Sequence, residues 1–108
     1  MSEPRPLSEA LSELHIELVR LLRTEGEHSL AGDLHMVRFH AWCDCGDDFC
    51  QSFRTAPAPE GSYGPGHRTV CLLGEEDTAM INLDVVRESV VYVEVIGRTR
   101  LRAQFRPI

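Results

Sequence analysis

Hydrophobic residues between positions 7 and 25 recur at intervals of three and four, the period of one face of an α-helix. The members of this stripe are Leu7, Leu11, Leu14, Leu18, Leu21 and Leu22. Ser8 is suited to cap such a helix at its N-terminus, and Gly26 stands where a C-terminal glycine is expected. We therefore predict an amphipathic helix over residues 7–25. The stripe lasts little more than two heptads, so packing on a sheet is favoured over a coiled coil.

From Leu34 to Cys43 the pattern changes to alternation, which predicts a β-strand. Its two faces are His35, Val37, Phe39 and Ala41 on one side, and Leu34, Met36, Arg38, His40 and Trp42 on the other. The segment 45–48 combines a glycine with two aspartates, which is the chemistry of a turn. Residues 49–55 are therefore expected to pair back as the second strand of a hairpin.

Residues 56–68 contain prolines and glycines that interrupt every regular period, which predicts a long Gly/Pro-rich loop. Three further strands are predicted over residues 69–73, 79–86 and 90–96, and the last two form a hairpin joined around Arg87-Glu88-Ser89. Leu101 and Phe105 stand at helical spacing within residues 98–106, so a short basic helix is expected there.

Strands that follow one another with short turns favour antiparallel pairing. We predict an α+β fold in which the N-terminal amphipathic helix packs on a four- or five-stranded antiparallel meander, followed by a short C-terminal helix. The length of 108 residues fits one domain over residues 1–108. Residues 1–6 are expected to be disordered.

The final hairpin predicts self-association. Met80 and Val86 accompany Ile81, Leu83 and Val85, so apolar residues occur on both of its faces. A strand buried on one side only shows cleaner alternation, and a single main helix covers about one face of the sheet. We expect a homodimer that buries the second face, or a protein partner there. In the alternative, the C-terminal helix folds back over that face within the monomer.

Composition and charge exclude some classes of function for this protein. The chain is 43% hydrophobic and 26% charged, which is typical of a soluble globular protein. A formal net charge of −6 argues against a nucleic-acid binder. No stretch approaches the roughly 20 apolar residues of a membrane span, and the N-terminus lacks the pattern of a signal peptide. A cytoplasmic protein with reduced thiols is therefore expected.

The cysteine cluster at positions 43–50 is the most unusual feature of the sequence. The four cysteines, with a histidine as a substitute, offer the sulfur and nitrogen ligands of structural zinc: Cys43, Cys45, Cys50 and Cys71, with His40 or His67. The Cys43-x-Cys45 spacing departs from the usual Cys-x2-Cys, which favours small buried thiols over zinc. Cys43 or Cys45 can also face Cys50 across a hairpin and form a disulfide. The neighbouring Asp44, Asp47 and Asp48 disfavour a reactive thiolate.

The long loop is a second candidate site. Tyr63, His67 and Arg68 stand beside glycines that allow backbone amides to approach an anion, and Trp42 flanks the cysteine cluster. These four residues form the predicted ligand-binding set. The loop lacks the Lys-Ser/Thr of a phosphate loop, so an ordered surface loop held by its own side chains is the favoured interpretation.

One resemblance extends over most of the chain from about Leu34. The run Cys43-x-Cys45-Gly46-Asp47-Asp48-Phe49-Cys50-x-Ser52-Phe53-x-Thr55-Ala56-Pro57, continued by Tyr63-Gly64-Pro65-Gly66-His67-Arg68, is similar to a group of small uncharacterised proteins from high-GC bacteria. The segments around Leu83 to Val86 and Val93 to Val95 resemble their terminal hairpin. That group has no assigned activity, so the resemblance implies a self-contained domain and transfers no catalytic residue.

No catalytic constellation emerges from these patterns. The serines at positions 52, 62 and 89 lie outside any Gly-x-Ser-x-Gly elbow. The sequence therefore favours a non-enzymatic protein-interaction or regulatory module. Two alternatives stay open: a module supported by zinc at the Cys/His set, and a module that binds an anion or small ligand at the 56–68 loop.

Overall fold

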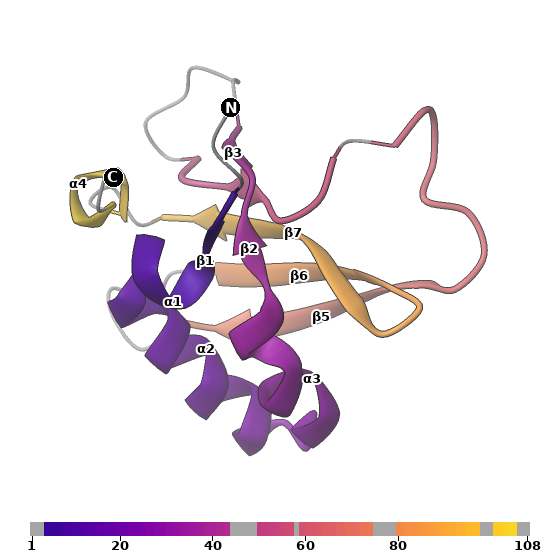
Figure 1. Ribbon diagram of the computed structural model, residues 1–108. Helices are drawn as coiled ribbons and strands as arrows, with labels where there is room; N and C mark the ends of the chain where they lie inside the picture. Colours follow the sequence, from indigo (N-terminus) through magenta and orange to yellow (C-terminus); the bar gives the residue numbers. More distant parts are fainter. Residues whose placement is uncertain (1–3, 44–49, 58, 75–79, 98–100, 106–108) are drawn as a thin grey trace.

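The computed structural model describes residues 4–43, 50–57, 59–74, 80–97 and 101–105 (Figure 1). N-terminal helices and a short C-terminal helix pack on a five-stranded antiparallel sheet, which confirms the predicted α+β fold. In chain order the elements are β1 (Arg5–Pro6), α1 (Leu7–Ala10), α2 (Ser12–Thr24), α3 (His28–Asp33), the 3-10 helix η1 (Leu34–Met36), β2 (Arg38–Phe39), β3 (Ala41–Trp42), β4 (Phe53–Arg54), β5 (His67–Leu73), β6 (Met80–Val86), β7 (Ser89–Ile96) and α4 (Leu101–Gln104).

The predicted N-terminal helix is present but divided. Leu11, with φ −138° and ψ 68°, is not helical and separates α1 from α2. Five members of the leucine stripe are nevertheless at most 1% exposed: Leu7, Leu11, Leu14, Leu18 and Leu22. They join one core with the side chains of the sheet, which confirms packing on a sheet.

The two predicted caps have different outcomes. α1 begins at Leu7 directly after Pro6, so Ser8 lies inside the helix and is not its N-cap. Gly26 has φ 79°, and the Glu27 N–H donates to the Leu22 carbonyl at 2.8 Å. This left-handed glycine after α2 is the predicted C-terminal signal, because glycine adopts that conformation without a steric cost.

The predicted strand over residues 34–43 is only partly correct. Residues 34–36 form η1, and the extended segment is divided into β2 and β3 at His40. β2 pairs with β1, whereas β3 pairs with β4, so the chain changes partner between the two. Phe39 and Trp42 consequently turn to the same side, with ring centroids 5.0 Å apart. Because the pairing partner changes at His40, side chains before and after it do not follow one continuous alternation, so the two predicted faces of residues 34–43 are not formed.

Residues 4–6 are ordered, although residues 1–6 were predicted to be disordered. Residues 4–6 are described, and Arg5–Pro6 forms β1 against β2 instead of a disordered segment. The Leu7 N–H donates to the Val37 carbonyl at 2.8 Å, and Arg38 Nη1 donates to the Pro4 carbonyl at 2.7 Å. These bonds fix the chain as it enters α1.

β6 and β7 form the predicted hairpin. The turn consists of Arg87 and Glu88, with φ values of 50° and 65°. Two left-handed residues in succession are what a type I′ turn requires, and its twist matches that of the flanking strands. The register shifts between Asp84 and Val85, because Val91 is an extra residue on β7. Such a bulge increases the local twist of the sheet.

The strand order is β3-β4-β7-β6-β5, which differs from a simple meander. β4 pairs with β7, so residues 55–66 must carry the chain past β7 and β6 to the far edge. Figure 1 shows this loop swinging out beyond the end of the sheet near the β6–β7 turn. There the Arg87 N–H donates to the Gly66 carbonyl at 3.1 Å. The valine-rich β7 thereby occupies the centre of the sheet, where both of its edges are paired.

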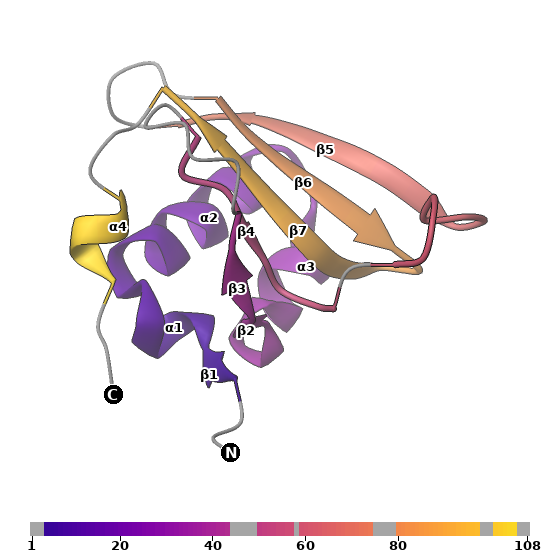
Figure 2. The same ribbon diagram turned by 90° about the horizontal axis from the view of Figure 1, so that it is seen from above.

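All the helices lie on one side of the sheet (Figure 2). We call this side the inner face and the opposite side the outer face. Leu101 of α4 is fully buried in the same core as the leucine stripe, and Phe105 packs on Phe39 and Trp42. The alternative in which the C-terminal helix covers the second face is therefore wrong. Within the described part of the chain, no helix has the length and apolarity to cross a bilayer.

Candidate functional site

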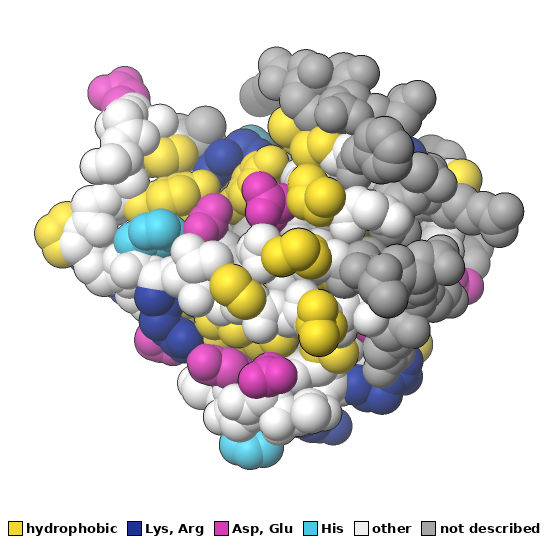
Figure 3. Space-filling model, turned by 180° about the vertical axis from the view of Figure 1, so that it is seen from behind, with side chains coloured by type: hydrophobic (Ala, Val, Ile, Leu, Met, Phe, Trp, Pro, Cys, Tyr) yellow, Lys and Arg dark blue, Asp and Glu magenta, His cyan; other side chains and the backbone are white. Residues whose placement is uncertain are grey.

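Within the described part of the chain, no helix lies on the outer face, where hydrophobic side chains stand beside acidic and histidine side chains (Figure 3). In an antiparallel sheet, residues directly opposite each other have their side chains on the same face. The strand registers therefore define which outer-face residues are neighbours. Two rows differ sharply in character.

The first row is apolar. Leu73 pairs with Met80, and Met80 pairs with Ile96. Their exposed fractions are 73%, 50% and 38%, so they lie open on three adjacent strands. We call these three residues the apolar row. The other large hydrophobic residues that are exposed in the described ranges, Ile16 and Met36, lie on α2 and η1.

A polar cluster occupies another part of the same face. His67 Nε2 lies 3.0 Å from Asp84 Oδ1, and Thr69 Oγ1 donates to the same oxygen at 3.1 Å. Asn82 Nδ2 donates to Glu94 at 2.8 Å. The Thr69 hydroxyl is thus held by a carboxylate and not by the imidazole, so this cluster lacks the nucleophile–base contact of a hydrolytic site.

The long loop is anchored to the polar cluster by Tyr63. Its ring packs on His67 with centroids 4.7 Å apart, and Arg54 Nη2 donates to the Tyr63 hydroxyl at 3.4 Å. Arg54 also donates to the Ala56 carbonyl at 3.0 Å and lies over the Tyr92 ring. Two predicted ligand-binding residues, Tyr63 and His67, are therefore neighbours, and both hold the loop on the outer face.

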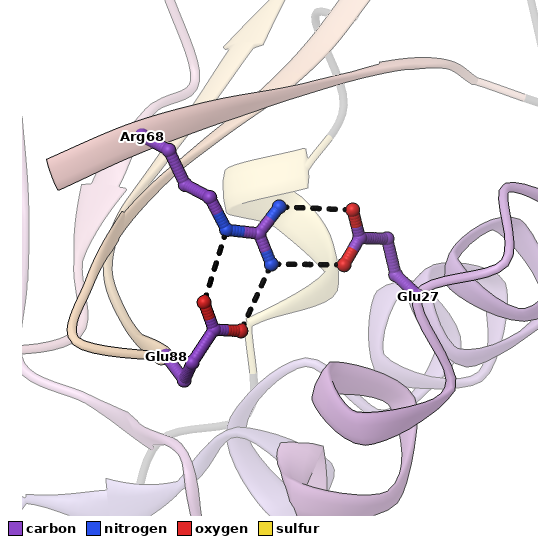
Figure 4. A network of polar contacts seen from close by, with 3 residues as sticks. All are labelled: Glu27, Arg68 and Glu88. Carbon is purple, nitrogen blue, oxygen red and sulfur yellow. Dashed lines mark hydrogen bonds and ion pairs between the residues drawn. The ribbon is translucent and has the colours of Figure 1, made fainter. Parts of the chain in front are cut away.

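Arg68, the third predicted ligand-binding residue, points elsewhere. It reaches Glu27, in the connection between α2 and α3, and Glu88, in the β6–β7 turn, through two bidentate contacts of 2.9 to 3.2 Å (Figure 4). Hydrogen bonds from Arg68 lower the pKa of Glu27, and hydrogen bonds to Glu27 and Glu88 raise the pKa of Arg68. The guanidinium is therefore occupied by two carboxylates and acts as a clamp between three segments.

Trp42, the fourth predicted residue, belongs to an aromatic cluster on the inner face. Its ring lies 5.8 Å from Phe53 and 5.6 Å from Phe105. Arg102 lies over the Trp42 ring, 4.8 Å from its centroid, and donates to the Cys43 carbonyl at 2.8 Å. Trp42 thus joins α4 to the sheet, and it is not brought together with Tyr63 and His67.

The cysteines are divided between the two edges of the sheet. Cys43 and Cys50 lie at the β3–β4 end, and Cys50 Sγ donates to Ser52 Oγ at 3.3 Å. Burial, followed by the hydrogen bond with Cys43, raises the pKa of Tyr92 beside them. Cys71 and His67 lie on β5 at the opposite edge. Cys50 bridges Ile96 of β7, so it lies about three strand spacings from β5, or roughly 14 Å, whereas Cys43 lies about four spacings away, or roughly 19 Å. Cys45 lies outside the described residues.

The predicted zinc ligands are consequently not brought together as one set. A zinc ion binds its ligands at about 2.0–2.3 Å, so Cys71 and His67 cannot join Cys43 and Cys50 around one ion. Among the residues that the structure describes, no group of three or more His, Cys, Asp or Glu side chains is placed to hold a metal.

A pocket of about 310 Å³ opens between α3, η1 and the start of β7. Leu30 and Val90 form its apolar floor, and Asp33, Arg38 and Glu88 lie among its polar lining. Glu88 is already bound by Arg68, and Arg38 by the Pro4 carbonyl. Sequence reasoning missed this pocket because it combines residues from three stretches that are far apart in the chain.

The sequence also left three partners of the predicted residues unassigned. Asp84 holds His67, and Glu27 and Glu88 hold Arg68. Glu27 lies 41 positions from Arg68 in the sequence, so no local spacing signals the contact. Arg54, by contrast, lies only two and nine positions from its loop partners Ala56 and Tyr63, so the sequence could have suggested that it anchors the loop.

Comparisons of the chain with family models, with curated proteins and with solved structures find no match. The function must therefore be argued from the surfaces described above.

Proposed function

We propose that this chain is a non-enzymatic protein-interaction module that docks another protein on the outer face of its sheet. The observation that carries the proposal is the apolar row. Leu73, Met80 and Ile96 lie side by side on three strands, and each is more than a third exposed. Single exposed hydrophobic residues are ordinary, whereas a contiguous group is typical of a binding surface.

The surroundings of the row fit an interface. Protein interfaces have an apolar centre and a polar rim. The rim here contains the Asn82–Glu94 pair and the cluster of His67, Thr69 and Asp84. Acidic side chains on this face and the net charge of −6 favour a protein partner over a nucleic acid.

The packing of α4 supports the same proposal. α4 contributes Leu101 to the inner core, so α4 does not cover the outer face. The sequence-based expectation of a homodimer through this face remains one form of the proposal. A different protein docked on the apolar row is the other form.

Photo-crosslinking in the native cell tests the proposal. A benzoylphenylalanine at Met80 is compared with one at Ile16, which is similarly exposed, at 53% against 50%, but lies on α2. We expect the probe at position 80 to form a covalent adduct with one dominant protein. The probe at position 16 should give no adduct of the same mass. The mass of the adduct tells a second copy from a different protein. Equal labelling at both positions, or none at position 80, would contradict the proposal.

A further inference from the structure

β5 forms an open edge of the sheet. It pairs with β6 on one side, and no other described residue makes a backbone hydrogen bond to it. The opposite edge strand, β3, has two residues, whereas β5 has seven. A long unpaired edge presents a row of backbone donors and acceptors that can template another strand.

The hydrogen-bond pattern shows which residues face this edge. In an antiparallel ladder, pairs that exchange backbone hydrogen bonds alternate with pairs that do not. The Arg87 N–H donates to the Gly66 carbonyl, so these two residues are a bonded pair. By alternation, the residues that bond to β6 are Arg68, Val70 and Leu72. The residues whose N–H and C=O groups point to the open edge are Thr69, Cys71 and Leu73.

The side chains on this stretch leave the edge accessible. Thr69, Cys71 and Leu73 are exposed on the outer face and carry no charge, while Val70 and Leu72 are buried on the inner face. Natural edge strands are usually blocked by lysine, proline or a bulge, and residues 69–73 contain none of these. Arg68, the cation on the same strand, is held by Glu27 and Glu88.

We propose that β5 pairs antiparallel with β5 of a second copy, across a two-fold axis at Cys71. Thr69 of each copy then lies opposite Leu73 of the other, and all the outward-pointing backbone groups meet in register. No like charges face each other, and Val70 and Leu72 of the two copies continue the apolar inner face. The edge therefore complements itself, which is what an isologous contact requires.

This pairing is separate from docking on the outer face and does not depend on it. The two-fold axis stands perpendicular to the joined sheet, so both outer faces lie on the same side. A dimer of this kind presents two apolar rows in one direction and can bind partners at two points.

Oxidation of Cys71 gives a direct test of the pairing, because the proposed dimer places the two Cys71 residues opposite each other. Residues opposite each other in a bonded antiparallel pair have Cα atoms about 5.5 Å apart, within the 4.4–6.8 Å that a disulfide spans. Diamide oxidises two Cys71 thiols to a disulfide by taking up their two electrons and two protons. A peptide that links Cys71 to Cys71 can only come from two chains. We expect it to be the main interchain product after brief oxidation of the wild-type protein.

A pair of substitutions at the same position gives the matched control. Cys71→Pro removes the outward N–H without touching the bonds to β6, whereas Cys71→Ser keeps that N–H. In sedimentation we expect twice the chain mass of 12.2 kDa for the wild type and Cys71→Ser, and the single mass for Cys71→Pro. Met80→Glu, which changes the outer face alone, is expected to keep the double mass.

Three outcomes overturn the inference. They are a monomeric wild type at about 100 μM, equal association of Cys71→Pro and Cys71→Ser, and interchain disulfides that omit the Cys71–Cys71 peptide. Circular dichroism checks that Cys71→Pro folds. If it does not, the peptide map of the wild-type protein decides alone.

Discussion

Arg68 shows how one side chain can connect three segments of this small fold. It binds Glu27 after α2 and Glu88 in the β6–β7 turn, while its backbone belongs to β5. The sequence placed Arg68 among the predicted ligand-binding residues and gave no sign of its two carboxylate partners. The reason lies in distance along the chain, because both carboxylates are remote and no periodicity connects them to position 68.

The clamp predicts an acid-dependent stability. Because Arg68 lowers the pKa of Glu27, the stabilisation is fully present above the unfolded-state pKa of about 4.3 and is lost as the pH falls through the folded-state pKa. We expect Arg68→Gln to lower the thermal midpoint by a few degrees at pH 7, with a difference from wild type that shrinks toward pH 3.

Arg87→Gln is the control for this measurement. It removes the same charge from the neighbouring turn, where the Arg87 side chain makes no hydrogen bond or ion pair within the described residues. An equal loss in both variants, or a difference for Arg68→Gln that persists unchanged at pH 3, would show that the clamp is not the cause.

At the scale of elements, the sequence predicted those whose periodicity is continuous. The leucine stripe of α1 and α2 and the alternation in β6 and β7 were both assigned correctly. The division of the 34–43 segment was missed, because β2 and β3 pair with different strands. The pairing of β4 with β7 was missed for a similar reason. Local pattern determines which side of a strand is buried, but not which strand lies beside it.

The β6–β7 turn contains a local strain that substitutions can test. Arg87 has φ 50°, a left-handed conformation that costs a non-glycine residue about 1 kcal/mol and suits asparagine better. We expect Arg87→Asn to stabilise the protein by roughly 0.5–1 kcal/mol in urea unfolding. Arg87→Val should destabilise it by at least as much, since β-branched residues tolerate this region poorly. Identical urea midpoints for both variants would refute the assigned turn geometry.

At the scale of the whole molecule, the helices gather on one face and leave two other surfaces open. The outer face carries the apolar row, and β5 carries unpaired backbone groups. The sequence indicated the first of these, because Met80 and Val86 accompany the buried residues of β6. It could not reveal the row itself, which depends on the register of three strands. The open edge of β5 depends on the strand order, which the sequence pattern also could not predict.

The central claim is that the apolar row binds a protein. Its most direct test is the affinity of the protein that crosslinks at position 80, measured by calorimetry for Met80→Glu and Ile16→Glu. We expect Met80→Glu to weaken binding at least about tenfold, or about 1.4 kcal/mol, because the contact would desolvate a carboxylate. Ile16→Glu, on the opposite side of the molecule's core, should change the affinity less than about twofold. Equal weakening by both substitutions, or unchanged affinity in both, would contradict the account.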